Sequence, residues 1–197
     1  IYAPAFHRAY EYLVEKGHAP QREWSASEIG RWLGYSSRDM WNEFMPGLDE
    51  ETVQHCSAMI GEAMLELTAC GKARLYEGSL DTLELLKNRG YRLIFLSNCK
   101  TSYMNAHIKA FKLDRYFEGF YCTQQYDFAP KHEIFSNILS EHPAVYAVAG
   151  DRFQDMEIAK KHHLLSVGCT YGYGEPHELE DSDFRISDIR ELVDILR

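Results

Sequence analysis

The chain has 197 residues, of which 45% are hydrophobic and 26% charged, ordinary globular proportions that exclude a disordered or fibrous chain. Thirty Asp and Glu residues against 21 Lys and Arg residues leave a formal net charge of −9, which disfavours a nucleic-acid partner and is compatible with cation binding. At about 150 residues per domain, this length predicts one large domain or one domain with an insertion.

Neither a membrane nor an oxidising compartment is indicated. No apolar run approaches the roughly 18 residues that cross a bilayer, and the first residues lack the basic and then apolar pattern of a secretion signal. The five cysteines are odd in number and widely spaced, and they form no CxxC pair. A disulfide framework or structural zinc site is therefore not expected, and the sequence predicts a cytoplasmic protein. Nothing in it indicates an oligomeric state.

The first 72 residues have helical periodicity throughout, with apolar side chains recurring every three or four positions. Ser25 and Glu28 are spaced as a capping box, and Asp49 is placed to cap a long helix. The predicted helices are residues 2–16, a short helix after Ser25 that ends at Gly34, a helix from about Ser37 to Pro46, and a long helix after Asp49.

From Ser79 onward, helices alternate with short apolar strands. This alternation predicts an α/β fold, a doubly wound, Rossmann-like parallel sheet with helices on both faces. We therefore expect a helical segment, residues 1–74, and an α/β core, residues 75–197. The predicted strands are 92–96, 120–123, 144–149, 164–170 and 184–186, and the predicted helices are 79–88, 101–111, 132–140, 155–162 and 189–196.

Polar residues follow two of the predicted strands, at the sheet edge where ligands of open parallel sheets bind. Ser97 and Asn98 come after the first strand and offer a hydroxyl, an amide and free backbone N–H groups, which together would form a small anion cradle. A helix cap is the alternative interpretation of this pair.

Two carboxylates follow the third predicted strand in the segment GDRFQD. Asp151 and Asp155, four residues apart, can face the same side as the next helix begins, and Mg²⁺ in proteins is commonly held by one or two carboxylates together with waters and substrate phosphate. The alternative is that Asp155 caps the helix and Asp151 only solvates the turn. Lys131, after Pro130, could reach a phosphate oxygen or remain a solvated surface lysine.

The order of these groups along the chain resembles the haloacid dehalogenase superfamily of phosphohydrolases. Ser97 with Asn98 matches its second motif, Lys131 its third, and Asp151 with Asp155 its fourth. The segments GDRFQDMEIAKKH and GCTYGYG are most similar to the phosphoglycolate phosphatase branch. The similarity spans about residues 75–197, and the helical start resembles the inserted cap of that branch.

The resemblance implies a Mg²⁺-dependent phosphohydrolase that acts on a small phosphorylated metabolite through an aspartyl-phosphate intermediate. Ser97 and the backbone N–H of Asn98 would hold phosphate oxygens, and Lys131 would neutralise charge on the aspartyl and phosphoryl groups. Asp151 would bind Mg²⁺ directly, and Asp155 would bind it or orient its water shell. Arg38, in the segment GYSSRDMW, could clamp a second anionic group of the substrate or be a surface arginine.

The superfamily's first motif, DxDxT, supplies the nucleophilic and acid/base aspartates, and the 197 residues do not contain it. In relatives it precedes the first cap helix, so we expect it immediately upstream of Ile1, because an initiator Met before Ile would be retained. The strand that carries the motif is central in this family, and its loss would leave two neighbouring strands with unpaired, buried backbone groups.

Two other functions stay open. A phosphosugar mutase shares this plan but returns the phosphoryl group to a sugar. A catalytically inactive phosphate-binding or regulatory module would keep the fold and the cradle without the nucleophile. Dehalogenation is less favoured, because that metal-free reaction has no use for a pair of metal-binding carboxylates.

Overall fold

The structure is a computed structural model that describes residues 1–196, and the chain divides into two compact units. The helical unit consists of Ile1–Arg74 and Thr101–Lys112. The α/β unit consists of Leu75–Lys100 and Leu113–Arg197, whose last residue is not described. Because the helical unit includes a second segment, the division into a cap of residues 1–74 and a core of residues 75–197 stays a prediction.

The helical unit is built from helices whose starts were readable in the sequence. Ser25 accepts the N–H of Glu28 and forms the expected capping box, and Asp49 Oδ1 accepts the N–H of Thr52 at 2.8 Å. The short helix after Ser25 ends four residues before Gly34, since a turn follows it. The helices are α1 (Tyr2–Glu15), α2 (Ala26–Gly30), α3 (Ser37–Phe44), α4 (Glu50–Ala69) and α6 (Thr101–Phe111).

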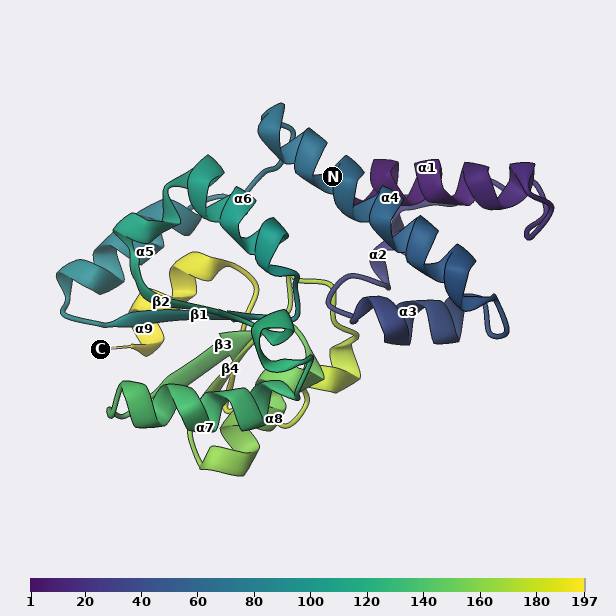
Figure 1. Cartoon of the computed structure of the whole chain (residues 1–197). Coiled ribbons are helices and arrows are strands. Elements are labelled where there is room, and N and C mark those ends of the chain that lie inside the picture. Colours follow the sequence, from purple (N-terminus) through teal and green to yellow (C-terminus); the bar gives the residue numbers. More distant parts are fainter. Residues whose placement is uncertain (197) are drawn as a thin grey trace. The chain divides into compact units, whose positions relative to one another are not determined.

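Aromatic rings fill the core of the helical unit. The ring centroid of Phe6 lies 5.7 Å from that of Trp24 and 5.3 Å from that of Phe44, both in edge-on geometry. Such tilted contacts add about 0.5–1.5 kcal/mol per pair to the burial of the rings themselves. Helices α1 and α4 lie against each other along this core (Figure 1).

The α/β unit contains five strands, and every observed pairing between them is parallel. This confirms the predicted fold class, with one correction. The described strands form two sheets instead of one, in the orders β1-β2 and β3-β4-β5. The strands are β1 (Leu93–Ser97), β2 (Phe117–Cys122), β3 (Ala147–Gly150), β4 (Leu165–Cys169) and β5 (Phe184–Ile186).

Helices flank these strands and bury two separate apolar clusters. One cluster joins Ile134 and Ile138 to Ile158, with Leu96 and Val148 of the two sheets packed against it. The other joins Val167 and Ile186 to Leu192. The helices are α5 (Ser79–Asn88), α7 (Lys131–Glu141), α8 (Phe153–His162) and α9 (Leu192–Ile195), with the 3₁₀ segments η1 (Leu113–Arg115), η2 (Thr123–Tyr126), η3 (Pro176–Leu179) and η4 (Ile189–Glu191).

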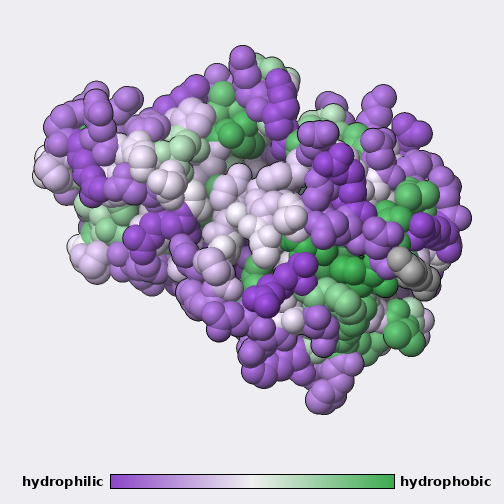
Figure 2. Space-filling model, turned by 180° about the vertical axis from the view of Figure 1, so that it is seen from behind, coloured by the Kyte–Doolittle hydropathy of each residue, from purple (hydrophilic) through white to green (hydrophobic). Residues whose placement is uncertain are grey.

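Strands β1 and β3 each have one edge that pairs with no strand among the described residues. All five residues of β1 are only half-buried, and β3 alternates between exposed and half-buried residues. Apolar side chains therefore stay partly exposed along strands that lie in the interior of most doubly wound sheets. From behind, the largest hydrophobic area of an otherwise mostly hydrophilic surface lies on the side of the α/β unit (Figure 2).

No helix in the described part of the chain has the length and apolar character needed to cross a bilayer.

Candidate functional site

The carboxyl end of β1 carries the first two predicted site residues. Ser97 is the last residue of the strand and lies opposite Cys122 of β2, and Asn98 follows it. Ser97 is hydrogen-bonded to the thiol of Cys99, and Lys131 is near enough for its charge to act on that thiol. Burial nevertheless raises the pKa of Cys99, so the thiol stays protonated at neutral pH. The structure thus brings the Ser97 segment and Lys131 together.

Lys131 is buried, which excludes the interpretation as a solvated surface lysine. Lys131 is the first residue of α7, whereas the predicted helix began one residue later and left it in the preceding loop. Only 8% of its side chain is exposed. Its Nζ donates to Oδ1 of Asp155 at 2.7 Å. A buried ammonium needs such a partner, because an isolated charge is costly to remove from water.

Asp155 therefore serves two local contacts. It is the third residue of α8, and its Oδ2 accepts the backbone N–H of Arg152, the N-cap residue, at 3.2 Å. A Cβ atom on Gly150 would lie 2.3 Å from the side-chain carboxyl carbon of Asp155, so only glycine fits at position 150. The capping interpretation of Asp155 is correct, and the same carboxylate also holds Lys131.

Asp151 is the more accessible of the two carboxylates. Its Oδ2 accepts the backbone N–H of Tyr173 at 2.7 Å, so Asp151 is tied to the segment that follows β4. Among the hydrogen bonds of the described residues, none is accepted by Oδ1. That oxygen is thus able to bind a ligand without breaking a contact.

These residues fit a hard divalent cation. The described residues contain no group of three or more His, Cys, Asp and Glu side chains placed to hold a metal ion. Mg²⁺ does not require one, because it is commonly held by one or two carboxylates with waters and a substrate phosphate completing an octahedron. Asp151 offers a free carboxylate oxygen for that purpose, and Asp155 lies one helical turn further along the chain.

Sequence reasoning missed one buried ion pair beside this site. Arg152 Nε donates to Oε2 of Glu178 at 3.0 Å, and less than a tenth of either side chain is exposed. Glu178 is the third residue of η3, and its Oε1 accepts the backbone N–H of Glu175, so the spacing of these two residues around Pro176 could have signalled a helix start. Nothing in the spacing shows that its partner is an arginine 26 residues earlier.

Arg38 lies in the first turn of α3, in the helical unit, and is exposed. It belongs to a different unit from the other predicted site residues, and its role toward a substrate stays a prediction.

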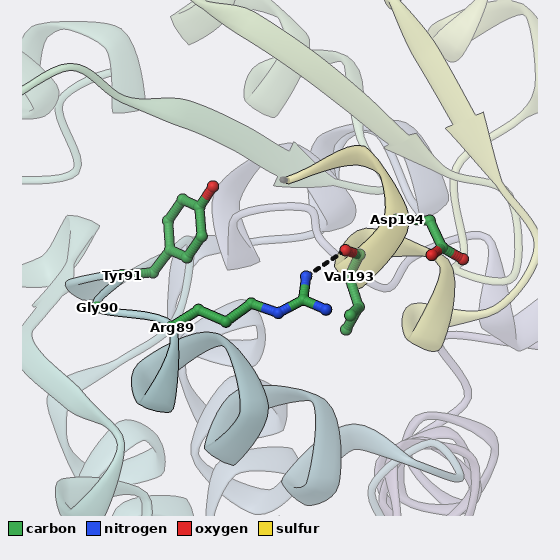
Figure 3. Close-up of a pocket in the computed structure, with 5 residues that line it drawn as sticks. All are labelled: Arg89, Gly90, Tyr91, Val193 and Asp194. Carbon is green, nitrogen blue, oxygen red and sulfur yellow. Dashed lines mark hydrogen bonds between the residues drawn. The ribbon is translucent and has the colours of Figure 1, made fainter.

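A pocket of about 690 Å³ lies at the opposite end of β1, where Arg89, Tyr91 and Val193 are among the lining residues (Figure 3). The guanidinium of Arg89 crosses it and donates to the carbonyl oxygen of Val193 at 2.5 Å. This arginine is therefore used to cap α9. Because ligands of open parallel sheets bind beyond the carboxyl ends of strands, we place the candidate site at Asp151 and not in this pocket.

The carboxyl ends of β1 and β3 are followed by a hydroxyl and two carboxylates, and the start of α7 adds the buried ammonium of Lys131, which contacts Asp155. Cationic and N–H groups of this kind stabilise the negative charge of a phosphoryl group, and the carboxylates suit a cation that would bridge to it. The arrangement is thus suited to binding a phosphate.

Comparison with curated proteins identifies phosphoglycolate phosphatases as relatives. The enzyme of Mannheimia succiniciproducens is 28% identical over 133 residues, which is 64% of this chain and 59% of that protein. The enzyme of Synechococcus elongatus is 25% identical over 183 residues, or 90% of this chain and 76% of that protein. The first of these matches thus covers less than two thirds of the relative's length.

Solved structures show the same fold. A predicted phosphoglycolate phosphatase from Haemophilus somnus 129pt superposes with a TM-score of 0.80 at 22% identity, covering 100% of this chain and 92% of that one. A predicted phosphatase from Clostridium acetobutylicum gives a TM-score of 0.80 at 20% identity, covering 98% and 91%. The family model for haloacid dehalogenase-like hydrolases matches residues 4–168. The chain therefore belongs to the haloacid dehalogenase-like hydrolase family.

Proposed function

We propose that the protein is a Mg²⁺-dependent phosphomonoester hydrolase that acts on a small phosphorylated metabolite. The observation that carries this proposal is the buried Lys131–Asp155 pair next to Asp151 at the carboxyl end of the parallel strands. Family membership and the names of the phosphoglycolate phosphatase relatives support it.

In this proposal each side chain has a separate role. The hydroxyl of Ser97 and the backbone N–H of Asn98 hold phosphate oxygens, and the ammonium of Lys131 neutralises charge that develops during transfer. Asp151 binds Mg²⁺ through its free oxygen. Asp155 holds Lys131 in place and orients the water shell of the cation. The bound cation would supply charge neutralisation on the phosphate oxygens.

These 197 residues contain no DxDxT motif. We propose that in the complete gene product an aspartate of that motif attacks phosphorus and displaces the substrate's alcohol oxygen, which takes up a proton from the second aspartate of the motif, and that water then hydrolyses the resulting aspartyl phosphate to release orthophosphate. The strand that carries it would pair with the open edges of β1 and β3, both of which run parallel to their present partners. This placement would satisfy the backbone groups of both edges.

The substrate class follows from the relatives and from Arg38. A compact metabolite with a second anionic group, such as phosphoglycolate, would be held by a bidentate contact from that arginine. Cytoplasmic location is part of the same proposal, and the five free thiols are compatible with a reducing compartment.

The test measures phosphate release by the complete product of the gene, first from an aryl phosphate and then from phosphoglycolate. We expect turnover with Mg²⁺ and none after addition of EDTA. Full activity in EDTA would contradict the metal assignment.

A phosphate-binding module is the second candidate, favoured by the lack of DxDxT in these residues. It predicts a complete gene product that binds orthophosphate and never releases phosphate from an ester. Reading the residues encoded before Ile1 separates the two candidates.

A further inference from the structure

The carboxylate of Glu178 contacts the segment that carries Asp151 and Asp155 at two points. Oε2 of Glu178 accepts the Nε–H of Arg152 at 3.0 Å and the backbone N–H of Phe153 at 2.9 Å. Arg152 and Phe153 lie between the two aspartates in the chain. Glu178 thus contacts both a side chain and the backbone of the segment on which the cation site depends.

The same carboxylate also fixes a second segment, residues 170–175, which we name the Tyr173 loop. Oε1 of Glu178 accepts the backbone N–H of Glu175, the last residue of that loop, at 2.9 Å. Glu178 accepts all three hydrogen bonds with a side chain that is only 7% exposed. One buried group therefore joins the segment after β3 to the loop after β4.

The Tyr173 loop in turn lies directly against Asp151. The N–H of Tyr173 donates to Asp151 Oδ2 at 2.7 Å, so one oxygen of this carboxylate is fixed by the loop. A Cβ atom on Gly174 would lie 1.8 Å from the carbonyl oxygen of Asp151, so the two backbones approach more closely than any other residue permits. A shift of the loop would move Asp151 with it.

We propose that Glu178 is a positioning residue of the cation site, which acts through Arg152, Phe153 and the Tyr173 loop to fix the carboxylate of Asp151. This inference rests on the proposed function, since it assigns Asp151 to the cation. Outer contacts of metal-binding carboxylates commonly change metal affinity by about 10- to 100-fold when they are removed.

The decisive variants are Glu178→Gln and the double variant Arg152→Met with Glu178→Leu. The first keeps an acceptor oxygen but removes the negative charge of Glu178 that faces Arg152. The second replaces both buried charges with apolar side chains, which is commonly tolerated better than removal of one partner. Glu180→Gln is the matched control, because Glu180 is exposed two residues further along the chain.

Two readouts that need no turnover are measured on folded protein. Calorimetric titration with Mg²⁺ should give a dissociation constant raised by about tenfold or more in both variants and unchanged in the control. Hydrogen exchange of the Tyr173 amide, followed by NMR, should accelerate by roughly tenfold or more in the same variants.

The results separate a positioning role from a merely structural one. Variants that unfold at lower temperature but keep both the wild-type Mg²⁺ affinity and the slow Tyr173 exchange would overturn the inference. If the wild-type protein itself binds no Mg²⁺, the proposed function fails on that point. Exchange at Tyr173 then decides alone whether Glu178 positions Asp151, with acceleration supporting it and unchanged exchange contradicting it.

Discussion

The two units of the chain differ in the kind of contact that stabilises the interior of each. The helical unit packs a cluster of aromatic and aliphatic side chains, and none of its described residues is a buried charged residue. The α/β unit buries Lys131, Arg152 and Asp155 and divides its apolar residues between two smaller clusters. The two units therefore differ in what they bury: aromatic and aliphatic side chains in the helical unit, and paired charges beside smaller apolar clusters in the α/β unit.

Removing the charge of Lys131 should have the largest effect on activity. Lys131→Met keeps the length of the side chain but removes the ammonium that we propose stabilises the transferring phosphoryl group, so phosphate release by the complete gene product should fall by about a hundredfold or more. Lys160→Met, on an exposed lysine, is the control.

Loss of stability could imitate this result, because Lys131→Met leaves the buried carboxylate of Asp155 without the positive charge of Lys131. Lys131→Met combined with Asp155→Asn should recover the thermal midpoint without recovering activity. Activity within twofold of the wild type in the single variant would remove Lys131 from the reaction.

The helical unit should respond to lost volume instead. Phe6 is buried among the rings of Trp24 and Phe44, so Phe6→Ala should lower the free energy of unfolding by about 3–5 kcal/mol in denaturant titrations. Phe128→Ala, at a half-exposed ring of the α/β unit, should cost far less. Equal losses in the two variants would contradict the expected contribution of the buried Phe6 ring.

Acid should weaken the charge-based contacts of the α/β unit. Burial raises the pKa of Glu178, but hydrogen bonds from Phe153, Glu175 and Arg152 outweigh it and leave the pKa below its usual value. Because the folded pKa lies below the unfolded one, the stabilisation is complete above about pH 4.3 and is lost as the pH falls toward the folded pKa. The thermal midpoint should therefore fall less steeply with acid in Glu178→Gln than in Glu180→Gln. Equal slopes in the two variants would contradict this assignment.

Arg38 should give the smallest and most selective effect. If it clamps a second anionic group, Arg38→Ala should lower kcat/KM for phosphoglycolate and hardly change it for an aryl phosphate without such a group. Equal effects on both substrates would point to a general role of α3.

The sequence predicted elements better than it predicted contacts between them. The capping residues Ser25 and Asp49 and the helix at 101–111 were identified from local patterns, because caps and periodicity act within a few residues. The order of Ser97, Lys131 and Asp151 along the chain also indicated the family, since this order can be read without knowing which residues are in contact.

What could not be predicted depends on residues far apart in the sequence. Lys131 pairs with Asp155 across 24 residues and Arg152 with Glu178 across 26, and no local pattern encodes either partner. The separation of the described strands into two sheets had one signal in the sequence, the missing DxDxT strand that was expected to leave two neighbouring strands unpaired. Periodicity alone predicts strands and not the edges at which they pair.

The central claim is that Asp151 makes this sheet edge a Mg²⁺ site for phosphate ester hydrolysis. The most direct test titrates Mg²⁺ against phosphate release by the complete gene product and its Asp151→Asn variant. The amide oxygen of asparagine can still accept the N–H of Tyr173, so the fold should persist while the ligand for a hard dication is lost. We expect Mg²⁺-dependent turnover in the wild type and little turnover at any Mg²⁺ concentration in the variant. Equal turnover and equal Mg²⁺ dependence in the two proteins would contradict the claim.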